Sequence, residues 1–217
     1  MPNSAPQCPL CWGRNSAAYS RDKFREYLLC EDCSLVFVPV QFHLTEQQEK
    51  AVYDLHRNDP QDPGYRNFLS RLFAPLCERL PPQASGLDFG CGPGPTLSLM
   101  FQEAGFSVEI YDKFYADNPQ LLQQGYTFIT ASEVVEHLRR PRQELEQLYR
   151  LLNDSGILGI MTKLVTSREA FAGWHYKNDR SHICFFSRKT FAWLGDHWGA
   201  EIEIVGQDVI LLRKTAV

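Results

Sequence analysis

The sequence predicts a three-layer α/β fold, in which helices cover both faces of a mostly parallel sheet that ends in an antiparallel strand. From Ser85 onward, short apolar runs typical of buried strands alternate with segments whose apolar residues recur at the helical period. The last two runs, 201–205 and 209–212, lie close enough to form a hairpin. A third observation, two C-x2-C pairs near the N-terminus, adds a small metal-stapled unit.

The hydrophobic pattern assigns the elements in order. Residues 45–82 read as a linker of two helices, and the first runs from Thr45 to His56, with Gln48 completing a capping box. A run rich in Pro and Asp separates it from a second helix over 65–80. We expect these helices to cap a ligand of the following domain. The expected strands of that domain are 87–89, 106–111, 127–131, 157–161, 201–205 and 209–212, and its expected helices are 97–104, 145–152 and 187–198.

Composition limits the classes of partner. A chain of 217 residues with 44% apolar content can bury one good core plus a small appendage. Its net charge of −4 provides no general field that would attract nucleic acid or an anionic membrane. The first residues, MPNSAPQ, lack the pattern of a signal peptide, and no apolar run approaches a membrane span. We therefore expect a soluble cytoplasmic protein with no membrane contact; its oligomeric state stays open.

Four of the seven cysteines form two pairs with the spacing of a zinc ribbon. Each C-x2-C turns two thiolates toward one point, and residues 12–29 are long enough for a hairpin that brings the pairs together. In a reducing compartment, metal ligation or buried thiols are favoured over disulfides. The alternative is four reduced cysteines packed as small apolar groups. The expected ligands are Cys8, Cys11, Cys30 and Cys33.

The predicted zinc ion is structural, because four thiolates close the tetrahedron and leave no position for substrate. The ribbon, residues 1–44, has too little apolar content to fold without a staple. We expect its core to be separate from that of the sheet. His43 is a less favoured alternative ligand, and the remaining cysteines read as core or loop residues.

The stretch LDFGCGPG, Leu87 to Gly94, combines a carboxylate with three closely spaced glycines at the end of a strand. It departs from the dinucleotide pattern G-x-G-x-x-G, and Asp88 would repel a pyrophosphate. The expected ligand is therefore cationic or zwitterionic. Asp112, at the end of the next strand, can meet the ribose of a nucleoside above the loop.

These features resemble the class I S-adenosylmethionine-dependent methyltransferases of the type 11/23-like group. The resemblance covers about residues 83–215 and rests on LDFGCGPG, on Asp112, and on TASEVVEHL, residues 130–138, followed by Pro141. It implies a Rossmann-like methyltransferase domain over 83–217 that binds S-adenosylmethionine. Zinc-ribbon leaders also occur before some members of this group. The cofactor-binding residues implied are Asp88, Gly90, Cys91, Gly92, Gly94, Asp112, Ser132 and Glu133; a purely structural glycine turn is the alternative.

One departure from the family is visible. Only residues 113–125 separate Asp112 from the next strand, so the usual third strand is short or absent. The acidic residue that binds the adenine in most family members therefore cannot be assigned to a position in this sequence. Asp117 is a weak candidate for that contact.

Methyl transfer needs the acceptor atom in line with the methyl group and, for a hydroxyl or carbon acceptor, a base. We expect residues 171–186 to form the substrate-side wall. His182 is the first choice as base because apolar neighbours suggest a partly buried ring, and His137 and Tyr176 are the other candidates. The alternative is that these histidines are ordinary core or surface residues.

Three classes of function remain. The favoured one is methyl transfer to an O, N or C atom of a small-molecule metabolite. The second is an RNA methyltransferase whose ribbon grips nucleic acid, but the acidic chain has no long basic stripe. The third is a non-catalytic cofactor-binding module. The ribbon cations that would serve an RNA substrate, or would offset the thiolate charge, are Arg14, Arg21, Lys23 and Arg25.

Overall fold

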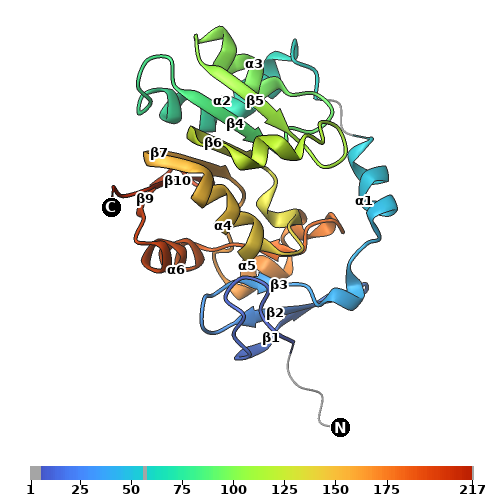
Figure 1. The fold of residues 1–217 in the computed structure, drawn as a ribbon. Coiled ribbons are helices and arrows are strands. Elements are labelled where there is room, and N and C mark those ends of the chain that lie inside the picture. The colour runs from blue at the N-terminus through green and yellow to red at the C-terminus, as the bar shows by residue number, and fades with distance from the viewer. Residues whose placement is uncertain (1–5, 56–57, 217) are drawn as a thin grey trace.

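A computed structural model describes residues 6–55 and 58–216. Its centre is a six-stranded sheet in the order β5-β4-β6-β7-β10-β9 (Figure 1). Neighbouring strands from β5 to β7 pair in parallel, whereas β10 is antiparallel to both β7 and β9. This confirms the predicted fold class. The strands are β4 (Ser85–Phe89), β5 (Ser107–Tyr111), β6 (Tyr126–Ser132), β7 (Leu152–Met161), β9 (Glu201–Val205) and β10 (Val209–Arg213).

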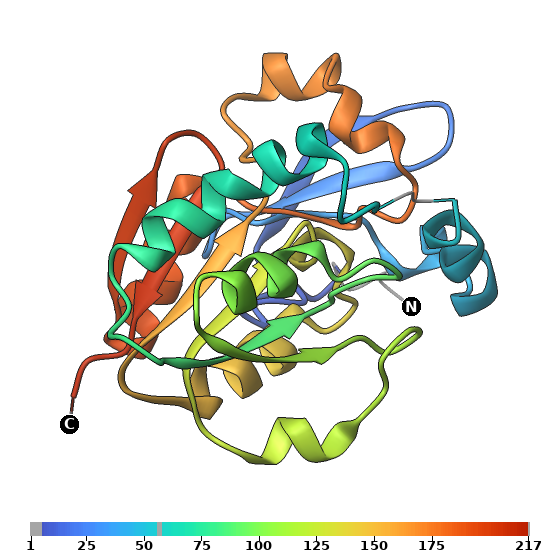
Figure 2. The same cartoon turned by 90° about the horizontal axis from the view of Figure 1, so that it is seen from above.

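Helices cover both faces of the sheet. On one face, α2 (Pro63–Cys77) and α3 (Thr96–Glu103) pack over one apolar cluster, and Figure 2 shows α2 running across the strands. On the other face, α4 (Pro141–Leu151) and α6 (Arg188–Trp198) pack over a second cluster. Successive side chains of β7 alternate between them, since Ile157 belongs to the first cluster and Leu158 to the second.

Local signals set several helix ends where the sequence places them. α1 (Glu46–Tyr53) begins with the predicted capping box between Thr45 and Gln48. Its predicted end at His56 lies outside the described residues. α2 begins where the Asp62 carboxylate accepts from the backbone N–H of Gly64, and α6 ends at Gly199 in the left-handed conformation.

Residues 113–125 contain no strand of the central sheet, as the sequence predicts. The segment holds only a short 3-10 turn, η2 (Pro119–Gln123). The shorter elements elsewhere are η1 (Val40–Phe42), η3 (Val135–His137), α5 (Arg168–Ala172) and η4 (His175–Asn178).

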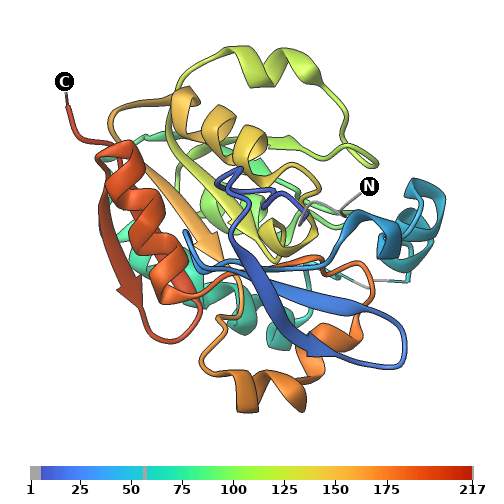
Figure 3. The same ribbon diagram turned by 90° about the horizontal axis from the view of Figure 1, so that it is seen from below.

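The N-terminal ribbon is not an independent unit. Its strands β1 (Ser16–Arg21), β2 (Glu26–Cys30) and β3 (Val36–Phe37) continue into β8 (Cys184–Phe185) from the C-terminal half of the chain. Figure 3 shows the β1–β2 hairpin beside the segment that carries α5.

The expectation of a separate ribbon core is therefore wrong. One apolar cluster includes ribbon residues and residues of the main domain. The Tyr27 ring, for example, lies 5.0 Å from the Phe171 ring and 5.9 Å from the Phe185 ring. A hairpin this small has one apolar face, and the face is buried against the main domain because the ribbon has no second layer of its own. The domain boundaries at 44 and 82 stay a prediction.

None of the helices in the described ranges has the length and apolar character needed to span a membrane.

Candidate active site

A cavity of about 740 Å³ lies at the carboxyl ends of β4, β5 and β6, where open α/β sheets bind their ligands. Residues of α1 and α2 close it from one side, as the sequence analysis expects of the linker helices. The residues predicted to bind the cofactor all line it, together with two of the three predicted bases. These are Asp88, Gly90, Cys91, Gly92, Gly94, Asp112, Ser132, Glu133, His137 and His182.

Two positions in the loop after β4 require glycine. Gly90 has a φ of +75°, and a Cβ there would lie 2.5 Å from the Val134 side chain. At Gly94 a Cβ would lie 2.0 Å from the backbone oxygen of Asn58. The loop is thus packed against neighbouring segments, and its bare backbone faces the cavity.

Asp112 fixes the end of β5 to this loop. One of its carboxylate oxygens accepts from the Gly92 N–H at 3.0 Å, and the other accepts from the N–H groups of Phe114 and Tyr115 at 2.8 and 3.2 Å. The carboxylate also lines the cavity. Asp117, the weak candidate for an adenine contact, is exposed and is not among the described residues that line the cavity.

Asp88 is buried beneath the loop and accepts a 2.8 Å hydrogen bond from the Thr130 hydroxyl. Burial raises the pKa of its carboxyl to about 6, against the opposing effect of that hydrogen bond. A cationic ligand in the cavity would favour the ionised form.

At the other end of the cavity, the His182 ring has a defined orientation. Its Nδ1 lies 2.7 Å from the backbone oxygen of Tyr176, so Nδ1 carries the proton and donates it there. The remaining lone pair is on Nε2, which lies 3.7 Å from the Asp179 carboxylate. The ring of His137 lies edge-on, 4.6 Å from that of His182.

Tyr176 occupies a different position from the one predicted. It is not among the described cavity-lining residues, and its hydroxyl contacts Glu136, Glu133 and Thr162. Burial raises its pKa far above the usual range, so the hydroxyl is a hydrogen-bond donor. The role of Tyr176 as a base stays a prediction. The predicted substrate wall is likewise narrower than 171–186: Asp179 and His182 reach the cavity, whereas His175 is exposed and lies 2.9 Å from Lys163 Nζ.

The sequence analysis missed Glu136, which has no exposed surface and accepts hydrogen bonds from Thr162, at 3.0 Å, and from Tyr176. Burial raises the pKa of Glu136 to about 8 and that of Glu133 to about 7. The sequence carries no local signal of this burial, because residues 133–140, EVVEHLRR, mix charged and apolar side chains.

Arg25 was also missed as a site residue. Only 3% of it is exposed, and its guanidinium donates to the backbone oxygens of Lys177, Asp179 and Arg180 at 2.7–2.9 Å. The ribbon hairpin thereby holds the segment that carries Asp179 and His182. Arg25 is consequently not free to contact a phosphate.

The α1 helix is tied across the cavity by ion pairs. Glu49, which is buried, lies 3.1 Å from Lys113 Nζ and 3.2 Å from Arg139 Nη2. These two cations come from the segments after β5 and after η3. The helix is thus attached to both sides of the cavity that it covers.

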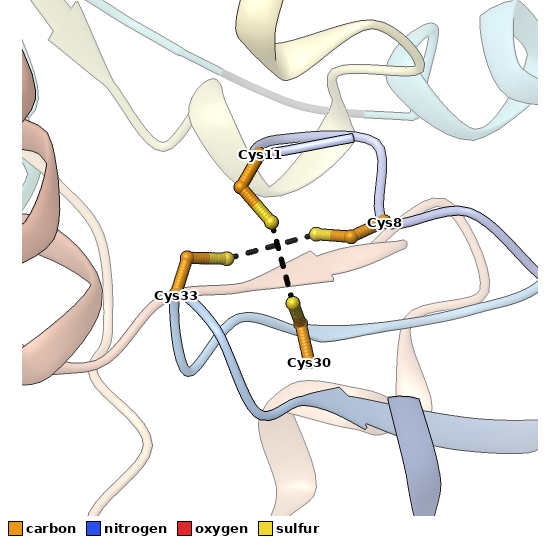
Figure 4. Close-up of side chains that lie close together, drawn as sticks. All are labelled: Cys8, Cys11, Cys30 and Cys33. Carbon is orange, nitrogen blue, oxygen red and sulfur yellow. Dashed lines mark hydrogen bonds between the residues drawn. The ribbon is translucent and has the colours of Figure 1, made fainter. Parts of the chain in front are cut away.

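The four predicted zinc ligands converge at the base of the ribbon (Figure 4). The sulfur atoms of Cys8 and Cys33 lie 3.6 Å apart and those of Cys11 and Cys30 lie 3.3 Å apart. In a tetrahedral thiolate site with Zn–S bonds of about 2.3 Å, sulfur atoms lie roughly 3.8 Å apart, so the set fits a zinc ion. His43 lies outside the cluster and contacts the Val38 backbone oxygen at 2.8 Å.

Comparisons with known proteins bear on the family and the fold. Residues 61–204 match the family described as a methyltransferase domain. No curated protein sequence gives a significant match.

Among solved structures, the chain is similar to the 1,6-didemethyltoxoflavin-N1-methyltransferase of Burkholderia thailandensis, determined with 1,6-didemethyltoxoflavin and S-adenosylhomocysteine bound. The TM-score is 0.52 at 16% identity, over 86% of this chain and 98% of that one. It is also similar to an O-methyltransferase family protein of the same organism, with a TM-score of 0.52 at 12% identity over 82% and 64% of the two chains. A third similar structure is CalO1, a methyltransferase in calicheamicin biosynthesis, with a TM-score of 0.50 at 11% identity over 79% and 59%.

At these identities the solved structures establish the fold, and the family match covers most of the chain. The chain belongs to the methyltransferase-domain family and is a class I S-adenosylmethionine-dependent methyltransferase.

Proposed function

We propose that this enzyme methylates an O, N or C atom of a small-molecule metabolite. The observation that carries the proposal is that one cavity joins the glycine loop and Asp112 to the His137–His182 pair. A cofactor bound at the first end and an acceptor at the second would be close enough for direct transfer. The toxoflavin methyltransferase, a structural neighbour, was likewise solved with a small-molecule ligand.

The part of the cavity formed by the glycine loop and Asp112 suits S-adenosylmethionine. When bound, this cofactor supplies a methyl group on a cationic sulfur. Backbone at Gly90 and Gly92 allows close approach, and Asp88 with Glu133 favours the cationic end. Asp112 would accept hydrogen bonds from the ribose hydroxyls of the bound cofactor, in addition to its contact with the Gly92 N–H. The rings of Phe89 and Tyr111, stacked at 5.4 Å, offer an apolar surface for the adenine in place of the missing third strand.

At the acceptor end, His182 removes the proton when the acceptor is a hydroxyl or an activated carbon. Because Nδ1 donates to the Tyr176 backbone oxygen, Nε2 is the ring nitrogen that would accept the proton, and Asp179 would stabilise the protonated ring. His137 packs against His182 and is the second candidate.

We further propose that Cys8, Cys11, Cys30 and Cys33 hold one structural zinc ion. The ribbon then serves the acceptor side through Arg25, which fixes the segment that carries His182. This role disfavours the RNA-binding alternative. Arg25 is the most buried cation of the ribbon, and its guanidinium already donates to backbone oxygens of the protein itself.

Calorimetry with S-adenosylmethionine tests the cofactor assignment. Asp112→Ala should weaken binding by roughly 1.5–3 kcal/mol, because a charge-assisted acceptor is lost. Glu109→Ala is the matched control, since Glu109 is exposed, belongs to β5 and is not among the described residues that line the cavity; this variant should bind as the wild type does. Equal affinity in the wild type and Asp112→Ala would remove the assignment. Labelled S-adenosylmethionine with metabolite extracts would then identify the acceptor.

A further inference from the structure

Glu136, His137 and His182 form a second cluster of possible metal ligands, distinct from the cysteines. One ligand atom from each side chain lies within 4.8 Å of the others. Glu136 and His137 come from η3, after β6, and His182 comes from the segment before β8. A hydrogen bond from Ile183 N–H to the Glu136 backbone oxygen, at 2.8 Å, holds the two segments together.

Hydrogen bonds around the cluster orient its side chains in the way that metal sites require. Nδ1 of His182 donates to the Tyr176 backbone oxygen, so Nε2 is the ring nitrogen that would bind a metal. The carboxylate of Glu136 accepts from the hydroxyls of Thr162 and Tyr176, and this fixes its plane. Three groups, the backbone oxygen of Tyr176 and the hydroxyls of Tyr176 and Thr162, thus orient the side chains of His182 and Glu136.

The two carboxylates at the cluster, Glu136 and Glu133, also favour the binding of a cation. Glu136 has no exposed surface, and Glu133 is linked to it through the Tyr176 hydroxyl. One oxygen of Glu133, Oε1, is buried without a hydrogen-bond partner. Within the described ranges, no ion pair joins a lysine or arginine to either carboxylate, and Lys163 and Arg71 act on Glu133 from beyond ion-pair distance. A buried carboxylate is costly to ionise even when hydroxyl groups donate to it, and a bound cation would lower that cost.

We propose that Glu136, His137 and His182 bind one divalent first-row transition-metal ion at the acceptor end of the cavity. Two imidazoles and one carboxylate suit such ions and leave coordination positions open, unlike the four closed thiolates of the ribbon. The inference rests on the proposed function in one respect, that the acceptor occupies this end. His182 is then a ligand, and the cation takes over its role by lowering the pKa of an acceptor hydroxyl.

Manganese binding tests the site directly. The full-length, zinc-loaded protein is titrated with Mn²⁺ and free Mn²⁺ is followed by electron paramagnetic resonance. Mn²⁺ prefers oxygen and nitrogen ligands, so it should not enter the thiolate site. We expect one Mn²⁺ per chain, with affinity reduced at least tenfold in His182→Ala and in Glu136→Gln. His175→Ala is the matched control, because His175 belongs to the same segment but is exposed and contacts Lys163.

The absence of saturable Mn²⁺ binding to the wild type would overturn the proposal, as would equal affinity in the wild type and His182→Ala. Should Glu136→Gln fail to fold, His137→Ala replaces it. Calorimetry with S-adenosylmethionine on the same samples separates the two proposals. Cofactor binding without Mn²⁺ binding would leave the proposed function standing and would overturn only the metal site. Mn²⁺ binding without cofactor binding would support the metal site and overturn the proposed function.

Discussion

At the scale of single residues, Asp88 illustrates how a binding site can lower the stability of the free protein. Its carboxyl is buried with one hydroxyl donor, and burial raises its pKa from 3.8 to about 6. The folded protein therefore binds more protons than the unfolded chain between about pH 4 and pH 6. The free energy of unfolding should fall as the pH rises through this window, by about 3 kcal/mol from this residue.

The substitution Asp88→Asn should remove this dependence, because the amide has no charge to bury and its oxygen can still accept from Thr130. We expect the variant to be more stable than the wild type at pH 7, by up to about 3 kcal/mol, and equally stable near pH 4. We also expect weaker binding of S-adenosylmethionine at pH 7, since the negative charge is lost. Urea denaturation at several pH values and calorimetry measure the two effects. A variant that is less stable than the wild type at pH 7 would contradict the interpretation.

The contrast between Asp88 and Arg25 shows which residues a sequence can reveal. Asp88 and Asp112 stand in or near a local motif, so spacing alone predicts their place. The three backbone oxygens that accept from the Arg25 guanidinium lie more than 150 residues away along the chain. Glu136 likewise acquires its burial from Thr162 and Tyr176. Roles that depend on such distant contacts leave no periodic signal.

At the scale of elements, the β1–β2 hairpin holds the acceptor-side segment through one guanidinium. Arg25→Lys keeps the charge but cannot reach the three backbone oxygens with a planar fork. We expect a loss of about 2–3 kcal/mol in unfolding free energy, because buried carbonyls lose their donors. Methyl transfer should slow, with affinity for S-adenosylmethionine nearly unchanged.

Arg21→Lys is the matched control for this change. Arg21 belongs to the same hairpin, but its side chain is 78% exposed and, among the described residues, its one ion pair is with Glu26 at 3.6 Å. Its replacement should alter neither stability nor transfer. If Arg25→Lys behaved in the same way, the hairpin would have no part in positioning the acceptor side.

The elements themselves were largely predictable, with one physical exception. Long periodic segments such as α4 and the β9–β10 hairpin follow the predicted pattern, since each has an apolar stripe or alternation of its own. β8 has two residues and exists because β3 pairs with it, so no local pattern could predict it. The expectation that the ribbon has a core of its own failed for the same reason, because the contacts that merge the two cores come from residues far away in the sequence.

At the scale of the whole molecule, that pairing joins the ribbon to the catalytic domain. The Val38 N–H donates to the Ile183 backbone oxygen at 2.9 Å, and Ile183 in turn donates to Glu136. A hydrogen-bonded path therefore runs from the ribbon sheet through Ile183 to Glu136, the neighbour of His137. The shared apolar cluster adds side-chain packing to this path.

Removal of zinc should consequently destabilise the whole chain and not the ribbon alone. A site that contributes about 5 kcal/mol would lower the melting temperature by roughly 10–20 °C, because the ribbon and the sheet share one core. We expect a single cooperative transition before and after chelation. Hydrogen exchange should show that protection of β1–β2 and of β6–β7 falls together. Re-addition of zinc, but not of Mn²⁺, should restore it, and this separates the thiolate site from the histidine cluster. Chelation that exposed β1–β2 while β6–β7 stayed protected would mean that the shared core does not couple the two parts of the protein.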